Sequence, residues 1–281
     1  MCLSPRRLIA LTTVLTAAAL PGAAHAQTPE PAPVAPAPAQ ITLGWEKLKP
    51  ANRALGRDLR QSRAIQRVVD AVNALVTVPR EIPIVFTDAT DIGPAYLPDQ
   101  KGQELGVIVF PGWFLKLSDD LLRRELRGVR GMGPKRTLRA ATQFVVAHEI
   151  GHALVDRLDL PVTGKEEDAV DGFAAYMLTS DKRFGPMVPL AAAMLFDGLK
   201  TDDRKLGDGD FADEHSLPQQ RTYQFVCWIY GSDPKRFKGI VGPDMLPRQR
   251  AQRCPAEYRQ VRRSWDRLLA PHRKPAEPAR R

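Results

Sequence analysis

The strongest constraint on the fold is a long helical pattern that carries two histidines, His148 and His152, four residues apart. We predict a helix over 136–158, because apolar residues recur there with a helical period. The apolar stripe comprises Val146, Ile150, Leu154 and Leu158. Residues four apart share one face of a helix, so both imidazoles project together from a side that the stripe leaves free. The sequence therefore predicts a core helix that presents an imidazole pair.

The residue after His148 adds an acid to this pair. Two neutral imidazoles on one helix face can bind a single zinc ion through bonds of about 2.0–2.1 Å. Glu149 follows His148 directly, so its carboxylate lies beside the metal position and can take a proton from water there. His-Glu-x-x-His on a helix is the signature of zinc metalloproteases. We therefore predict Zn²⁺ as the cofactor, His148 and His152 as metal ligands, and Glu149 as the catalytic base.

A catalytic zinc site of this kind needs a third protein ligand and an open fourth position. The helix predicted over 165–178 supplies candidates, and we favour Glu167, because a second acid, Asp171, lies one turn further on the same face. Asp171 is expected to accept the outer N–H of a ligand histidine and so to fix its tautomer. Glu166 is expected to form a capping box with Thr163, three residues earlier.

Other residues compete for these roles. Glu166, Asp168 and His215 remain alternatives for the third ligand. His215 is also our first candidate for a second catalytic residue, a donor that stabilises the oxyanion formed during hydrolysis. Tyr176 and Tyr223 are the next candidates for that donor.

The remaining patterns predict an α+β fold that is rich in helix and has a small β-sheet on its N-terminal side. Short β-branched runs at 82–86 and 105–110 predict two strands. We expect the second strand to run along the cleft and to pair with an extended substrate, as edge strands can. Further helices are predicted over 58–78, 118–126, 188–199, 217–229 and 255–269.

The N-terminus has the features of an export signal. Arg6 and Arg7 precede a short apolar run at 8–20, and small residues surround a cleavage position after Ala26. This arrangement predicts a signal peptide over 1–26. The apolar run is too short to span a bilayer. We therefore expect a periplasmic or secreted protein with no stable membrane span after processing.

The rest of the chain divides by composition. Residues 27–40 alternate proline and alanine and predict an extended linker. One domain is expected over 41–272, followed by a basic tail at 273–281. Cys227 and Cys254 are the cysteines left after processing. In an oxidising compartment this pair predicts a disulfide, with two buried thiols as the alternative.

The basic balance of the chain does not indicate nucleic-acid binding. The formal net charge is +9, and arginine is frequent in the last quarter of the sequence. Nucleic-acid binding would require these charges on a recognition motif or interleaved with stacking aromatic residues, and the sequence has neither arrangement. We interpret the arginines as a solvated basic face.

The motif and the helix after it resemble the zincin metallopeptidases, in the gluzincin branch, which bind zinc through two histidines and one glutamate. The chain is more closely similar to a bacterial family of secreted metallopeptidases whose function is uncharacterised. Three blocks carry this similarity: AHEIGHALVDRLDLPVTGKEEDAVDGFAAYML, DEHSLPQQRTYQFVCWIYGSDPKRF and RCPAEYRQVRRSWDRLLAPH. A weaker match covers AVNALVTVPREIPIVFTDATDIGPAYLPD, and together the blocks span most of 58–272. The resemblance implies a zincin-like fold, zinc-dependent hydrolysis and a protein or peptide substrate.

Two other functions remain open at this point. The protein could be a zinc amidase that acts on a non-peptide or cell-wall amide, or a zinc-stabilised binding protein without turnover. Glu149 favours turnover, because a purely structural zinc site needs no base and normally has four protein ligands. Members of the similar family also carry a cysteine pair near the first strands, which this chain lacks. A second disulfide is therefore not expected.

Overall fold

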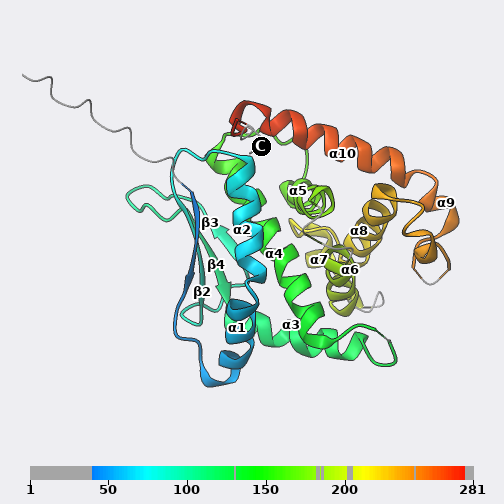
Figure 1. The fold of residues 1–281 in the computed structure, drawn as a ribbon, viewed down its shortest axis with the longest axis horizontal. Helices are drawn as coiled ribbons and strands as arrows, with labels where there is room; N and C mark the ends of the chain where they lie inside the picture. Colours follow the sequence, from blue (N-terminus) through cyan, green and yellow to red (C-terminus); the bar gives the residue numbers. More distant parts are fainter. Residues whose placement is uncertain are drawn as a thin grey trace, which may run out of the picture. The chain divides into compact units, whose positions relative to one another are not determined.

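A computed structural model describes residues 40–129, 131–181, 184, 187–200, 205–243 and 245–275. The predicted signal peptide, almost all of the predicted linker and the end of the predicted basic tail lie outside these residues. The predicted fold class is confirmed: helices dominate, and one small mixed sheet is present (Figure 1).

The helices and strands follow one another with the sheet near the N-terminal end of the described chain. The strands are β1 (Ile41–Trp45), β2 (Ile82–Thr87), β3 (Ala95–Leu97) and β4 (Val107–Pro111). The α-helices are α1 (Pro50–Ser62), α2 (Ala64–Leu75), α3 (Gly112–Glu125), α4 (Pro134–Arg157), α5 (Glu166–Ser180), α6 (Met187–Gly198), α7 (Asp208–Ala212), α8 (Pro218–Ser232), α9 (Arg248–Ala251) and α10 (Cys254–Leu269). The described residues also include the short 3₁₀ helices η2 (Lys238–Ile240) and η3 (Ala270–His272).

The sheet has the strand order β1-β2-β4-β3. β1, β2 and β4 run parallel to one another, whereas β3 pairs antiparallel with β4. The expectation that the strand at 105–110 forms an edge along the cleft is wrong, because β4 lies between β2 and β3. The edge strand next to β4 is β3, a segment of three half-buried residues with prolines on both sides. It is too short to show the alternation that identifies a strand in a sequence.

Helix α4 forms the centre of the fold. It packs against α2 and α3, against β3 and β4, and against α5 and α6. In Figure 1 the sheet lies on one side of α4, and α5, α6 and α8 lie on the other. Nearly every residue of α4 from Thr137 to Leu154 is buried, His148 and Glu149 included. Because other helices and strands surround α4, their side chains can contact its polar face as well as its apolar stripe.

The predicted single helix at 58–78 is wrong. The structure has two helices there, and the first begins at Pro50, a residue suited to the first turn of a helix. Arg63 ends α1 in the left-handed conformation, with φ of 52°, and its N–H donates to the carbonyl of Arg60. A non-glycine residue adopts this conformation only where its surroundings favour it. The apolar period continues across the break, so it could not reveal the break.

The C-terminal helix is tied to the domain at both ends. A disulfide joins Cys227 of α8 to Cys254 at the start of α10, which is the pair predicted from the sequence. At the other end, the backbone N–H of Lys274 donates to the carbonyl of Leu75, and the N–H of Thr77 donates to that of His272. Residues beyond the predicted domain end at 272 therefore still pair with the connection between α2 and β2.

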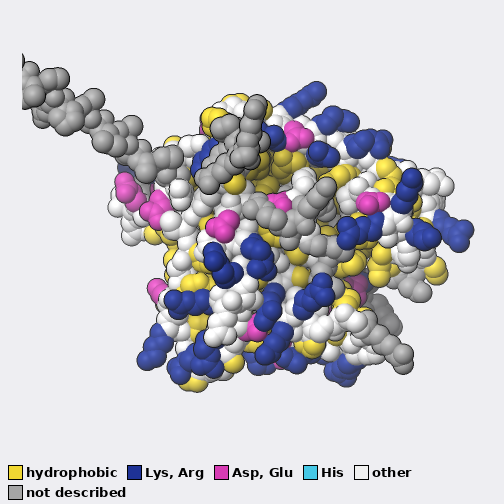
Figure 2. All heavy atoms as spheres, in the orientation of Figure 1, with side chains coloured by type: hydrophobic (Ala, Val, Ile, Leu, Met, Phe, Trp, Pro, Cys, Tyr) yellow, Lys and Arg dark blue, Asp and Glu magenta, His cyan; other side chains and the backbone are white. Residues whose placement is uncertain are grey.

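The basic side chains are distributed over the surface, and the helices can be compared with the length that crosses a bilayer. Figure 2 shows Lys and Arg side chains spread over the face in view, including the edge formed by α10, rather than gathered into one patch. Among the described residues, no helix is both long enough and apolar enough to cross a membrane.

Candidate metal centre

The two histidines of α4 lie side by side, as their spacing predicts. Nε2 of His148 and Nε2 of His152 are 3.3 Å apart, and the two rings meet edge to face at an interplanar angle of 81°. The side chain of His148 is buried, and that of His152 is partly exposed to a cavity. Both inner nitrogens therefore point to one common position.

The carboxylate of Glu167, in the first turn of α5, reaches the same position. Its Oε2 lies 3.1 Å from Nε2 of His148, and its Oε1 lies 3.2 Å from Nε2 of His152. The structure thus brings together the three residues that the sequence favoured as metal ligands. Their role as ligands stays a prediction.

The three rival ligands have other partners. Glu166 contacts the outer nitrogen of His152, with Oε1 2.7 Å from Nδ1. Asp168 accepts a hydrogen bond from the hydroxyl of Ser216 at 2.8 Å. His215 approaches the cluster through Glu167, with Nε2 3.1 Å from Oε2.

The predicted capping box between Thr163 and Glu166 is wrong. Helix α5 begins at Glu166, and its N-cap is Lys165 rather than Thr163. Glu166 is therefore the first helical residue, whereas a capping box requires it to be the third. Its side chain turns to His152 instead, a contact that joins α5 to α4 and that no local pattern indicates.

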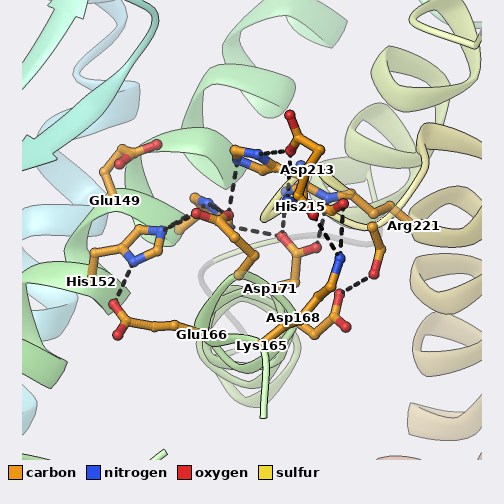
Figure 3. Close-up of polar contacts among 12 residues, drawn as sticks. Glu149, His152, Lys165, Glu166, Asp168, Asp171, Asp213, His215 and Arg221 are labelled. Carbon is orange, nitrogen blue, oxygen red and sulfur yellow. Dashed lines mark hydrogen bonds and ion pairs between the residues drawn. The ribbon is translucent and has the colours of Figure 1, made fainter. Parts of the chain in front are cut away.

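Each histidine thus has a carboxylate on its outer nitrogen. Nδ1 of His148 lies 2.8 Å from Oδ1 of Asp171, and Nδ1 of His152 lies 2.7 Å from Oε1 of Glu166 (Figure 3). Such partners favour the tautomer in which Nδ1 carries the proton and Nε2 has a free lone pair. Both inner nitrogens are therefore arranged to bind a metal ion.

Sequence reasoning missed Arg221 of α8. Its guanidinium donates from Nε to Oδ2 of Asp171 at 2.8 Å and from Nη2 to Oδ1 at 2.7 Å, and both side chains are buried. This two-point contact fixes the carboxylate that orients His148. The available signal was a single arginine on the apolar face of its helix, four residues before the buried Phe225. A charged residue on a buried face needs a partner.

Glu149 lies on the wall of a cavity of about 640 Å³, together with His148, His152, Glu167 and His215. Its Oε2 accepts a hydrogen bond from the backbone N–H of Tyr96, in edge strand β3, at 3.0 Å. This contact comes from outside α4 and holds the carboxylate on the cavity side. The sequence did not indicate it, because it depends on where a short strand packs.

The cluster fits a divalent metal ion. Two imidazole nitrogens and one carboxylate oxygen lie within 4.8 Å of one another, and this is a donor set found in catalytic metal sites. Oε2 of Glu167 is buried and has no hydrogen bond, although two imidazole nitrogens lie 3.1 Å away. A buried carboxylate oxygen without a hydrogen bond, beside the Nε2 lone pair of His148, favours a shared cation between them. A second possible group, which combines Glu167 with Glu214 and His215, shares the same carboxylate.

A comparison with models of protein families shows to which family the chain belongs. The model of the DUF4344 family, described as "Putative metallopeptidase", matches residues 46–269. The chain belongs to the DUF4344 family. The match covers most of the chain and includes every residue of the metal cluster, so the resemblance to a metallopeptidase family of uncharacterised function is confirmed. No curated protein and no solved structure matches the chain.

Membership of the DUF4344 family indicates what the residues of the metal cluster are expected to bind. A metallopeptidase family implies a metal ion and peptide substrates. Of the described residues, His148, His152 and Glu167 are a group that can hold such an ion, and they open onto a cavity. Residues of α4, of the start of α5, of strand β3 and of the segment between α7 and α8 line that cavity.

The candidates for the oxyanion donor are placed very differently in this DUF4344 chain. His215 lines the cavity and faces Glu167. The hydroxyl of Tyr176 instead donates to Asp266 at 2.9 Å and accepts from Arg273. Tyr223 is 45% exposed on α8 and lines a different, shallow pocket. The structure therefore brings His215 to the metal cluster and leaves both tyrosines out of it.

Helices α4 and α5 approach closely at Gly151, inside the motif. A Cβ atom on Gly151 would lie 2.8 Å from Cβ of Val170 and 3.2 Å from Cδ1 of Phe173. Val170 is three residues after Glu167 in the same helix. The glycine therefore permits the spacing that brings Glu167 to the histidines.

Replacement of Gly151 by alanine is expected to lower the free energy of unfolding by about 1–3 kcal/mol. It should also weaken metal binding, because α5 must move away from α4. Urea unfolding and metal titration measure the two effects. Gly164→Ala is the matched control, since a Cβ there has no atom within 4 Å. Equal metal affinity in both variants would contradict this role for Gly151.

Proposed function

We propose that this protein is an exported, zinc-dependent metallopeptidase that hydrolyses peptide bonds, with Glu149 as general base. The observation that carries the proposal is the convergence of two imidazole nitrogens and the Glu167 carboxylate within 4.8 Å, beside Glu149 on an open cavity. Two histidines and one glutamate are the ligands of a recurrent class of catalytic zinc sites. Three protein ligands leave a position for water or substrate.

His148, His152 and Glu167 would hold the zinc ion. When bound, zinc lowers the pKa of water to about 7 and polarises the substrate carbonyl. Glu149 then accepts a proton from the attacking water and passes it to the leaving amine. The N–H of Tyr96 restrains one oxygen of this carboxylate. The contact with Glu167 raises the pKa of His215. In its protonated form, with Nδ1–H held by Asp213, His215 would donate from Nε2 to the oxyanion that develops on the carbonyl.

The substrate is proposed to lie along β3. This strand pairs with β4 through one edge only, so an extended peptide can add to its free edge. The backbone of Tyr96 in β3 contacts Glu149, the proposed general base, and this contact supports a substrate position along that edge. We therefore propose that β3, rather than the strand at 105–110, pairs with the extended substrate.

A cavity of about 160 Å³ with a largely apolar lining opens beside His148 and Glu149, and His215 and Arg221 also line it. Its apolar lining comprises Pro94, Phe114, Phe144, Val145, Leu195, Phe196 and Leu199. A fully apolar cavity of about 150 Å³ holds a benzene ring, so this volume suits a side chain of that size. We infer that a phenylalanine or leucine side chain next to the cleaved bond fills it.

Export is supported by features outside the metal cluster. The sequence begins with a pattern typical of a cleavable signal peptide. The disulfide between Cys227 and Cys254 is compatible with an oxidising compartment. Both features favour a periplasmic or secreted location.

The proposal is tested by incubating the purified mature protein with an unfolded protein and, separately, with peptidoglycan fragments. We expect zinc-dependent cleavage of the unfolded protein beside large apolar residues, lost with a chelator and restored with zinc. Mass spectrometry of the products identifies the cleaved bonds. Release of products from peptidoglycan alone would instead support the amidase function.

Zinc binding to the metal-free protein is expected to release protons. Burial alone would lower the pKa of His148, but contacts with Asp171 and Glu167 outweigh it and raise this pKa to about 10. Burial would likewise raise the pKa of Glu167, yet three imidazoles hold it well below its usual range. Zinc requires neutral imidazoles, so its affinity should fall as the pH falls.

Calorimetry at pH 6 in buffers of different ionisation enthalpy counts these protons. At this pH, water on zinc keeps its proton because its pKa is about 7, so the count reports the imidazoles. We expect the heat of binding to depend on the buffer, with at least one proton released per zinc ion. A heat that is the same in all buffers would contradict the prediction.

Replacement of Asp171 by asparagine is expected to weaken zinc binding about 10–100-fold. The amide cannot support His148 as a carboxylate does, and it leaves Arg221 without its ion-pair partner. Competition with a fluorescent chelator measures the affinity. Asp70→Asn, on α2, is the control for loss of a carboxylate elsewhere. Unchanged affinity in folded Asp171→Asn would refute the proposed role.

A further inference from the structure

The segment that carries His215 is held by the first turn of α5. Residues 213–217 connect α7 to α8. Nζ of Lys165, the N-cap of α5, donates to the backbone carbonyl of Asp213 at 2.9 Å and to that of His215 at 3.2 Å. One lysine thus bridges two carbonyl groups of this short connection, on either side of Glu214 (Figure 3).

A second contact from the same turn holds the next residue. Oδ1 of Asp168 accepts a hydrogen bond from the hydroxyl of Ser216 at 2.8 Å. Between these two contacts, Glu167 touches Nε2 of His215. The first turn of α5 therefore supplies the third candidate metal ligand and also fixes the segment opposite to it.

The orientation of His215 depends on such polar contacts. Its side chain is 42% exposed, so packing restrains it little. Asp213 contacts it twice through Oδ1, at 2.7 Å from the backbone nitrogen and at 3.0 Å from Nδ1. With Nδ1 occupied in this way, Nε2 is the nitrogen left to face Glu167 and the cavity.

We propose that Lys165, assisted by Asp168, is a positioning residue that clamps residues 213–216, so that Nε2 of His215 faces the metal position. The clamp matters because a donor stabilises a developing oxyanion only if it is already in place. This inference rests on the proposed function, in which His215 is that donor. Lys165 itself does not touch the reacting atoms.

The first experiment replaces Lys165 in the full mature protein loaded with zinc. Lys165→Met should lower kcat about tenfold, since loss of positioning slows chemistry, while KM and zinc content stay unchanged. Lys165→Arg should restore most of kcat, because a guanidinium can still donate to both carbonyls. Lys235→Met, an exposed lysine beyond the far end of α8, is the control.

A double-mutant cycle then tests whether Lys165 acts through His215. His215→Phe should lower kcat about 10²-fold. In that background Lys165→Met should have no further effect, because coupled residues are not additive. If the two losses multiply, or if Lys165→Met alone keeps full kcat, the clamp is overturned. If His215→Phe keeps full kcat, the donor role of His215 in the proposed function fails.

A third readout does not depend on turnover. NMR of the histidine ring nitrogens, assigned with His215→Phe, reports the position of the His215 imidazole directly. In Lys165→Met the His215 signals should broaden or shift, while those of His148 and His152 stay in place. Unchanged His215 signals would overturn the clamp even if the protein proves to hydrolyse another substrate.

Discussion

Replacement of Glu149 by glutamine is expected to lower kcat/KM about 10²–10⁴-fold, the usual contribution of a general base. Glutamine preserves the size of the side chain and can still contact the N–H of Tyr96 through its carbonyl oxygen. It cannot accept a proton. Because Glu149 is not among the proposed ligands, the variant should still bind one zinc ion per protein. Metal analysis and initial rates on an unfolded protein, measured on the same sample, separate the two effects.

A matched control tests whether the loss is specific to this carboxylate. Glu214 lies on the same cavity and is exposed, so Glu214→Gln removes an equal charge there. We expect Glu214→Gln to retain most of the activity. If Glu149→Gln kept its activity with zinc bound, Glu149 would not be the base. A zinc-stabilised binding protein would then explain the site better.

The second large effect is expected from His152→Ala. Two of the three proposed ligands remain in this variant, and a catalytic zinc site normally needs all three. We therefore expect zinc to be lost during dialysis and hydrolysis to fall to background. His152 is preferred to His148 for this test, because the His148 side chain is more deeply buried and contacts Asp171.

His272→Ala is the control for removal of a histidine. This residue lies in η3, and its backbone carbonyl accepts a hydrogen bond from the N–H of Thr77. The control should keep one zinc ion per protein and full activity. Retention of stoichiometric zinc by His152→Ala would show that the ion binds elsewhere, for example at the group formed by Glu167, Glu214 and His215.

Helical periodicity accounts for the part of the site that the sequence could predict. The spacing of His148 and His152 placed both imidazoles on one face of a helix, and the structure shows their inner nitrogens 3.3 Å apart. The same reasoning on the next helix selected Glu167 and Asp171, and both contact His148. Within a regular helix, relative orientation follows from sequence separation alone.

The missed features depend on packing between distant segments. Arg221 meets Asp171 across 50 residues, and Tyr96 meets Glu149 across 53. Neither contact has a local pattern. Glu166 was misread because the start of α5 lies two residues later than the apparent capping box requires. The break at Arg63 was hidden because the apolar period runs through it, and only tertiary contacts decide the conformation at such a position.

The most direct test of the central claim is a crystal structure of the zinc-loaded mature protein, with anomalous scattering measured at the zinc edge. We predict one peak bonded to Nε2 of His148 and of His152 at about 2.0–2.1 Å and to Glu167 at about 2.0–2.2 Å, with a fourth position open. A peak outside bonding distance of the two imidazoles would contradict it. Glu167 turned away from the ion would contradict it equally.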